Sequence, residues 1–297
     1  MKLTYDLLDD ETLFTNVFVI VDDSYASLYF PQKDTLRKGP MPNLSDSEVI
    51  TLEIMRELKG VNSQKRWMHY VKNHWLCLFP KLNERSRYHR RVKDLYQIIN
   101  LIRKKVLHLL HIPYETHYLI DSLPIPVCHY ARSGRAKAFK GDADFGYCEA
   151  KDEKFFGFKL HTVTTITGTP VNFVLASGNH HDVNLVHELL EPFSNVVVGG
   201  DKGYVSSLLK KALAEEKHIH FIATPRKNQK GPPPGDRWFL KHFRKTIETL
   251  FSQLTDFFHV NVVRAKTLWG LITNLHTKIT AYTLGAYLSK TMETLKT

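Results

Sequence analysis

Hydrophobic spacing divides the chain into a helical first part and a mixed remainder. Apolar residues recur at helical spacing over 44–60, where Ser45 is followed three positions later by Glu48, the pair that is typical of a capping box. A second block over 86–110 also carries its apolar residues on one stripe. We therefore expect an all-helical N-terminal region over residues 1–112.

From about residue 116 the pattern changes to short apolar runs that alternate with amphipathic segments. Strands are predicted at 118–122, 155–168, 170–177, 195–200 ("NVVVGG"), 218–224 and 260–265 ("VNVVRA"). Helices are predicted at 183–193 ("VNLVHELLEPF"), 206–217, 237–258 and 269–288. Pro124 and Pro126 are expected to interrupt regular structure after the first strand. This order predicts a mixed sheet with helices packed on it, over residues 113–297.

The charge of the chain favours an anionic partner. The 297 residues include 41 Lys or Arg against 30 Asp or Glu, a formal net charge of +11. Between residues 81 and 105 there are nine Lys or Arg and only two acids, on a predicted helical stretch. DNA is the first candidate partner, because clustered cations gain free energy by releasing counterions from phosphates. The predicted contacts are Arg87, Arg90, Arg91 and Lys93, and a solvated helix face is the alternative.

Other sequence features favour a cytoplasmic protein. Apolar runs such as 16–21 are too short to span a bilayer and are flanked by acids rather than led by basic residues. The three cysteines form no C-x-x-C pair, which favours reduced thiols and disfavours a zinc ribbon.

Three acids lie where the predicted sheet and its helices would bring ligands together. Asp121 lies inside an apolar strand, where an unpaired carboxylate is costly, and Asp201 directly follows the "NVVVGG" strand. Glu248 lies at the border of the apolar stripe of the long helix, with Arg244 one turn earlier. If the two strands are parallel neighbours, the aspartates meet at one edge of the sheet. Three carboxylates suit Mg²⁺ or Mn²⁺, and two such ions about 4 Å apart promote phosphoryl transfer.

Each acid also has an ordinary interpretation. An aspartate after a strand is commonly a turn or cap residue, and a glutamate on an amphipathic helix is commonly on the surface. Gly199 and Gly200 are expected to let the backbone turn tightly before Asp201 and leave room for a ligand. The three acids in this order are more specific than any one of them.

Four stretches together resemble one known family. They are "LIDSLPI" (119–125), "GFKLH" (157–161), "GGDKGY" (199–204) and the Arg-x-x-x-Glu spacing of 244–248. This arrangement resembles the RNase H-like catalytic domain of DDE transposases from short bacterial insertion sequences. The chain departs from the signature of some groups, which places a tyrosine at the position of Lys241 and a lysine at that of Thr255.

The resemblance implies an RNase H-like α/β fold in which Asp121, Asp201 and Glu248 are the catalytic, metal-binding residues. It implies two Mg²⁺ or Mn²⁺ ions, cleavage at the terminal inverted repeats and joining of the freed 3′-hydroxyl to target DNA. It also implies assembly on double-stranded DNA as a homodimer or larger complex. The alternatives are a catalytically silent DNA-binding protein with this fold and a plain metal-dependent nuclease.

Several neighbours of the three acids are candidates for lesser roles. Arg244 and His161 are expected to support the site, whereas Asp182 is interpreted as a helix cap. Further candidate DNA contacts flank the second acid or precede the long helix: Lys202, Tyr204, Arg226, Lys227 and Lys230.

Overall fold

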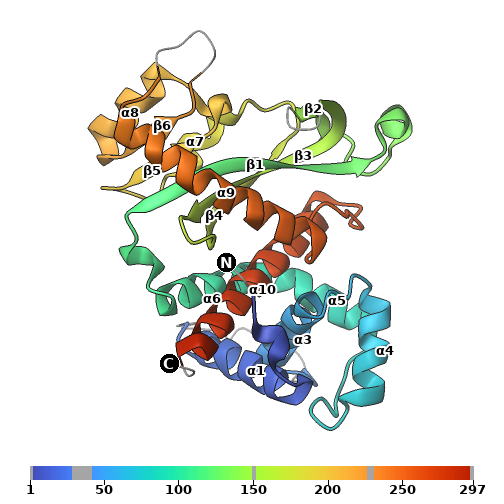
Figure 1. Ribbon diagram of the computed structural model, residues 1–297. Helices are drawn as coiled ribbons and strands as arrows, with labels where there is room; N and C mark the ends of the chain where they lie inside the picture. Colours follow the sequence, from blue (N-terminus) through green and yellow to red (C-terminus); the bar gives the residue numbers. More distant parts are fainter. Residues whose placement is uncertain (1–2, 29–41, 149–151, 226–230, 295–297) are drawn as a thin grey trace. The chain divides into compact units, whose positions relative to one another are not determined.

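A computed structural model describes residues 3–28, 42–148, 152–225 and 231–294 (Figure 1). It divides into two compact units, which we call the helical unit and the mixed unit. The helical unit comprises Lys2–Leu110 together with Ile272–Thr297, and the mixed unit comprises His111–Leu271. The expected boundary between residues 112 and 113 lies close to the change of unit between Leu110 and His111. The C-terminal segment from Ile272 differs from the expectation, because it belongs to the helical unit. Among the described residues, no helix is both long and apolar enough to cross a membrane.

The helical unit is built around one almost fully buried helix. Its helices are α1 (Asp10–Ala26), α3 (Asp46–Leu58), α4 (Gln64–His74), α5 (Arg85–Asp94), α6 (Tyr96–Leu109) and most of α10 (Leu268–Thr294). Every residue of α3 except Glu48 is buried, and Ser45 and Glu48 form the predicted capping box at its start. The block over 86–110 forms two helices instead of one, separated at Leu95, whose backbone leaves the helical region.

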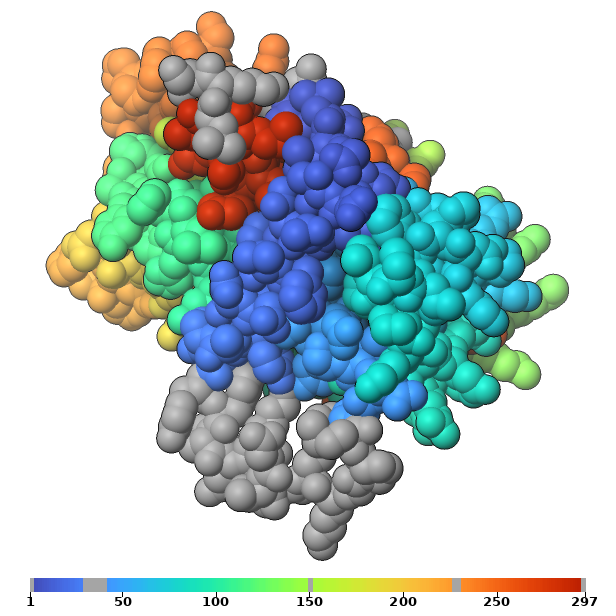
Figure 2. All heavy atoms as spheres, turned by 90° about the horizontal axis from the view of Figure 1, so that it is seen from below, coloured from blue at the N-terminus to red at the C-terminus, as the bar shows by residue number. Residues whose placement is uncertain are grey.

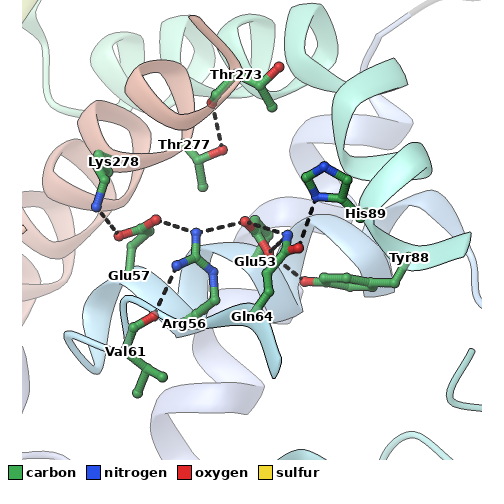
Figure 3. Close-up of polar contacts among 10 residues, drawn as sticks. All are labelled: Glu53, Arg56, Glu57, Val61, Gln64, Tyr88, His89, Thr273, Thr277 and Lys278. Atoms are coloured by element: carbon green, nitrogen blue, oxygen red, sulfur yellow. Dashed lines mark hydrogen bonds and ion pairs between the residues drawn. The ribbon is translucent and has the colours of Figure 1, made fainter. Parts of the chain in front are cut away.

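Charged side chains of α3 and α10 meet in the core of the helical unit (Figure 3). Arg56 pairs with Glu53 at 2.7 Å and with Glu57, and the ammonium of Lys278 lies 2.8 Å from Glu57. Tyr88 donates to Glu53 at 2.8 Å. All five residues are buried, so each charge needs a partner. Two cations and two carboxylates balance, and the pairing joins α10 to a helix more than 200 positions earlier.

The mixed unit contains one sheet, with six strands in the part of the chain that is described. They are β1 (His117–Cys128), β2 (Asp144–Cys148), β3 (Glu153–Thr165), β4 (Pro170–Ser177), β5 (Val197–Gly200) and β6 (His220–Ala223). β1 is central: it is antiparallel to β3 and parallel to β5, which is in turn parallel to β6. β2 and β4 both pair with β3, along different stretches of it. The predicted mixed sheet, flanked by helices and preceded in the chain by helices, is confirmed.

Helices cover both faces of this sheet. On one face, α7 (Val186–Leu189) and α8 (Ser207–Lys217) pack with Ile120, Val198 and Phe221 in a common core. On the other, α9 (Pro234–Asp256) crosses β1 and β5 (Figure 1).

The glycine pair of β5 corrects one expectation. Gly199 and Gly200 belong to the strand and do not turn the backbone. A Cβ on Gly199 would lie 2.7 Å from the ring of Phe239 on α9, and one on Gly200 would lie 2.9 Å from Ile120. The pair is therefore needed for close packing on each face of the sheet.

The first strand is longer than predicted. β1 continues through Pro124 and Pro126, which pair with Lys159 and Gly157 of β3. Beyond Ile120 no residue of β1 pairs with β5. Proline is tolerated at a strand position whose missing N–H faces no partner strand, so one-sided pairing explains the extension.

Three other segments differ from the sequence-based expectations. Residues 260–265 form no strand. Val260 is buried and Val262 is exposed, so the apolar residues of this segment do not share one buried face. The predicted helix over 183–193 is reduced to the 3₁₀ turn η4 (Asp182–Leu185) and the single turn of α7. β2 was not predicted, since its apolar residues Phe145 and Tyr147 point largely to solvent.

Lys278→Met is expected to destabilise the helical unit by about 3–5 kcal/mol, because it leaves the two buried carboxylates of Glu53 and Glu57 to share the single charge of Arg56. Hydrogen exchange of the α3 amides in the full chain measures this loss. The exposed Lys290→Met on the same helix is the control. Adding Glu57→Gln to Lys278→Met should restore much of the protection. Equal protection in the Lys278→Met and Lys290→Met variants would contradict a stabilising contact between Lys278 and Glu57.

Gly199→Ala is expected to lower the unfolding free energy of the mixed unit by about 1–3 kcal/mol, since the added methyl group overpacks the β5–α9 contact. Gly134→Ala, where a Cβ meets nothing within 4 Å, is the matched control. Thermal unfolding that is the same for both variants would show that α9 can move away at no cost.

Candidate active site

The pairing of β1 with β5 places two aspartates side by side. Ile120 pairs with Gly200 at the last step of the parallel ladder, so Asp121 and Asp201 follow it on neighbouring strands. Ser122 donates its backbone N–H to Asp121 at 2.8 Å. Both carboxylates line a pocket, to which α9 contributes Arg244 and Ile247.

The environment of Asp121 disfavours its charge. Burial raises the pKa of this carboxyl to about 7; the Ser122 N–H and the Arg244 guanidinium oppose the rise, and the carboxylates of Asp201 and Asp182 add to it. A carboxyl poised in this way beside two others is typical of a site that receives a cation or a proton.

Arg244 connects the third acid to this pair. Its Nη1 atom lies 3.7 Å from Asp201 Oδ1, and its Nε donates to Glu248 Oε1 at 3.2 Å. Arg244 and Glu248 are one turn apart on α9, and both side chains are more than half exposed. Glu248 does not line the pocket. The structure therefore brings Asp121 and Asp201 together directly, and links Glu248 to them through the arginine.

No group of three or more His, Cys, Asp or Glu residues within the described ranges has an arrangement that could hold a metal ion. The aspartate pair supplies two carboxylates on neighbouring strands, and burial together with the charge of Asp201 raises the pKa of Asp121. Hard carboxylate oxygens of this kind suit Mg²⁺ or Mn²⁺. The pair fits such an ion, and Glu248 would complete the set if its side chain left Arg244.

Asp182 lies in a second polar cluster next to the aspartate pair. Its carboxylate accepts from Lys159 Nζ at 2.8 Å and from Ser122 Oγ at 3.3 Å, and the N-cap position before η4 is held by His181. A Cβ on Gly203 would lie 3.1 Å from it. The helix-cap interpretation is therefore wrong: Asp182 joins β1, β3 and the segment after Asp201. Lys159, the central residue of "GFKLH", was missed, and its charge inside a mainly apolar strand was the available signal.

His161 belongs to the core beside this cluster. It pairs with Ser122 across β1 and β3, is fully buried, and contacts the Tyr204 hydroxyl through Nδ1 at 3.2 Å. Burial lowers the pKa of His161 to about 4, so the ring is neutral at pH 7. Its Nε2 finds no hydrogen-bond partner among the described residues.

Tyr204 is also buried, at 1% exposure, and its ring packs edge-on against His161. This corrects the expectation of a DNA contact, because a ring that is enclosed by the core of the mixed unit cannot reach a duplex.

The basic candidates differ in their surroundings. Arg87 and Arg90 of α5 are exposed on the helical unit, part of whose surface Figure 2 shows in blue to teal. Arg91 instead pairs with Asp46 and donates to the Leu44 carbonyl at 2.6 Å, contacts that hold α5 against the start of α3.

Two further placements complete the basic candidates. Lys93 is half-buried, and Lys202 is exposed directly after Asp201. Arg226, Lys227 and Lys230 lie outside the described residues.

Comparison with known proteins gives a family match and distant structural similarity to solved proteins. No curated protein matches the chain. A solved structure described as a pre-cleavage Mos1 transpososome is 11% identical, with 92% of this chain and 84% of that chain covered. Its TM-score of 0.20 is too low to establish a shared fold.

The family described as "Transposase DDE domain" matches residues 114–268. The matched segment is just over half of the chain and includes all six strands together with Asp121, Asp201 and Glu248. The chain belongs to the Transposase DDE domain family.

Proposed function

We propose that this protein is a DNA transposase that cleaves the phosphodiester bonds at the ends of its element and joins the freed 3′-hydroxyl to target DNA. The observation that carries the proposal is the register of β1 and β5, which sets Asp121 beside Asp201 inside the family segment. The carboxyl ends of parallel strands are a common location for ligands in α/β sheets.

The proposed catalytic residues are Asp121, Asp201 and Glu248, acting with Mg²⁺ or Mn²⁺. Asp121 and Asp201 would hold the cation between them, which would offset the burial and repulsion that raise the pKa of Asp121. When bound, two such ions activate the attacking oxygen and stabilise the leaving oxygen of an in-line displacement.

Arg244 is proposed to exchange partners when DNA arrives. A guanidinium binds a phosphate through two parallel hydrogen bonds, which is a stronger arrangement than its exposed contacts with Asp201 and Glu248. A phosphate that took Arg244 would release Glu248 toward the aspartate pair. Both side chains are more than half exposed on α9, so other residues do not lock them in their present rotamers.

Recognition of the inverted repeats is assigned to the helical unit, with Arg87 and Arg90 of α5 as exposed phosphate contacts. Lys202 is proposed to contact DNA next to the acids. Bringing two element ends together requires at least two copies on DNA, so a homodimer or larger assembly is part of the proposal. The setting proposed is the bacterial cytoplasm, with the protein on the nucleoid when it is bound to DNA.

Asp201→Asn is expected to reduce Mg²⁺-dependent cleavage of element ends by more than about 100-fold, since loss of even an outer-shell partner of a metal site costs 10–100-fold. Gel analysis of labelled ends measures cleavage and strand joining together. Asp256→Asn, an exposed acid on α9, is the control. Wild type that binds ends without cutting supports the silent DNA-binding alternative, and cut ends that never join a target support the plain nuclease.

Asp121→Asn is expected to stabilise the metal-free protein above pH 7. The folded-state pKa of about 7 exceeds the unfolded value near 4, so the charge penalty is absent at low pH and develops between pH 4 and 7. The expected gain in the free energy of unfolding is about 1–3 kcal/mol at pH 8, a value reduced because the Asp121 side chain is partly exposed. Urea unfolding with EDTA measures it, and the gain should shrink toward zero near pH 4.

Millimolar Mg²⁺ should stabilise wild type at pH 8 more than it stabilises Asp121→Asn, because only wild type keeps both aspartates. Equal stabilities of wild type and Asp121→Asn at pH 8 in EDTA would contradict the claim that the buried charge of Asp121 destabilises the metal-free protein.

A further inference from the structure

At the level of the acids, the two faces of the sheet carry different polar groups. Side chains alternate between the faces along a strand, so Asp121 and Ser122 point to opposite sides of β1. Asp121 faces α9, where it lines the pocket with Arg244. Ser122 shares its face with Ile120, which belongs to the core under α7 and α8, and it pairs with His161 of β3. The proposed chemistry takes place on the α9 face and assigns no role to the polar groups behind it.

Five polar residues on the face opposite α9 form what we call the rear cluster: Ser122, Lys159, His161, Asp182 and Tyr204. Asp182 is its centre, because its carboxylate accepts from Lys159 Nζ at 2.8 Å and from Ser122 Oγ at 3.3 Å. The side chains of Lys159 and Asp182 are only 16% and 18% exposed. His161 and Tyr204 are buried and meet through Nδ1 and the hydroxyl at 3.2 Å. The ion pair is therefore shielded from water and held from several sides.

Ser122 connects the rear cluster to the first acid. Its backbone N–H donates to the Asp121 carboxylate at 2.8 Å, and its hydroxyl donates to Asp182. The two bonds leave one residue on opposite faces of β1, so a shift of Ser122 would move the donor that orients Asp121. Asp182 thus restrains Asp121 through the strand.

The backbone after the second acid also lies against Asp182. A Cβ on Gly203 would lie 3.1 Å from Asp182 Oδ2, so a larger residue there would press on the carboxylate. The next residue, Tyr204, donates its N–H to the Asp201 carbonyl at 3.1 Å and packs its ring edge-on against His161. The turn that follows Asp201 is therefore packed against the same carboxylate that holds Ser122.

We propose that Asp182 is a positioning residue, which is held by Lys159 and keeps Asp121 and Asp201 at the separation that a divalent cation requires. Two carboxylates repel each other while the ion is absent, so their own interaction does not maintain that separation. Outer groups that orient the ligands are a general feature of metal sites. The inference rests on the proposed function for the cation, but not on the joining of DNA.

The test is the affinity of the full chain for Mn²⁺ at pH 8 without DNA, measured from the electron paramagnetic resonance signal of free Mn²⁺. Ser122→Ala and Asp182→Asn should each weaken Mn²⁺ binding by about 10-fold or more, the loss expected for a group that orients metal ligands. The Mg²⁺ concentration for half-maximal cleavage of element ends should rise in proportion. The cleavage rate at saturating Mg²⁺ should stay within about threefold of wild type, because the proposed catalytic acids are still present.

Lys159→Met separates positioning from attraction by charge. This substitution removes a cation near the acids, so charge alone would tighten Mn²⁺ binding. Positioning has the opposite sign: binding should weaken by about threefold or more, because Asp182 loses the ammonium that fixes it. Ser122→Ala changes no charge, so attraction by charge leaves its Mn²⁺ affinity unchanged, whereas positioning lowers it.

Two controls remove comparable groups elsewhere in the mixed unit. Thr164→Val removes the buried hydroxyl that donates to the Thr169 carbonyl at 2.9 Å, and Asp256→Asn removes an exposed carboxylate. Both should bind Mn²⁺ like wild type. Urea unfolding shows that each variant is folded, and Thr164→Val should lose stability without losing affinity, which is the result that a purely structural role of Asp182 would also give.

Two results would overturn the proposal. Tighter Mn²⁺ binding by Lys159→Met, together with weaker binding by Asp182→Asn, identifies attraction by charge. Mn²⁺ affinities of Ser122→Ala and Asp182→Asn that match those of the two controls leave Asp182 with a role in stability alone.

The wild-type protein separates this inference from the proposed function. Wild type that neither binds Mn²⁺ nor cuts element ends refutes both. If wild type cuts ends with Mg²⁺ while the rear-cluster variants match the controls, only the positioning role of Asp182 is refuted.

Discussion

The parallel pairing of β1 with β5 is the constraint on which the candidate site depends. β5 has only four residues, and its last two are glycines that pack against opposite faces of the sheet. The ladder fixes Asp201 beside Asp121, and the missing side chain of Gly199 lets α9 lie close enough for Arg244 to reach Asp201. One short strand thus sets the positions of both the acids and the helix that carries the third.

Negative charge is in excess around the acids of the candidate site, whereas the chain as a whole is basic. Four carboxylates, those of Asp121, Asp182, Asp201 and Glu248, surround two cations, Lys159 and Arg244. This local excess of negative charge lies in a protein whose net charge is +11. A strongly basic protein with a local group of acids can attract a polyanion to its surface and a divalent cation to those acids.

The sequence predicted the features that depend on local pattern. An acid inside an apolar strand and another directly after one were enough to place Asp121 and Asp201, and a 3.6-residue stripe placed Glu248 on its helix. Features that depend on distant partners were out of reach. One-sided pairing with β3 allows β1 to pass two prolines, and a contact between Lys278 and Glu57 places α10 in the helical unit. Asp182 could not be assigned without knowing that Lys159 and Ser122 converge on it.

The position of α10 has a consequence for the order of events during synthesis. Glu53 and Glu57 leave the ribosome early with only Arg56 to neutralise them, and Lys278 follows more than 200 residues later. The mixed unit is continuous in sequence and is complete before that point. Because domains fold as they emerge, the sheet with its acids can form while the N-terminal helices still lack their last partner. A chain that ended before residue 278 would carry the acids on a folded sheet and an unfinished helical unit, so translation to the end decides whether the two units are present together.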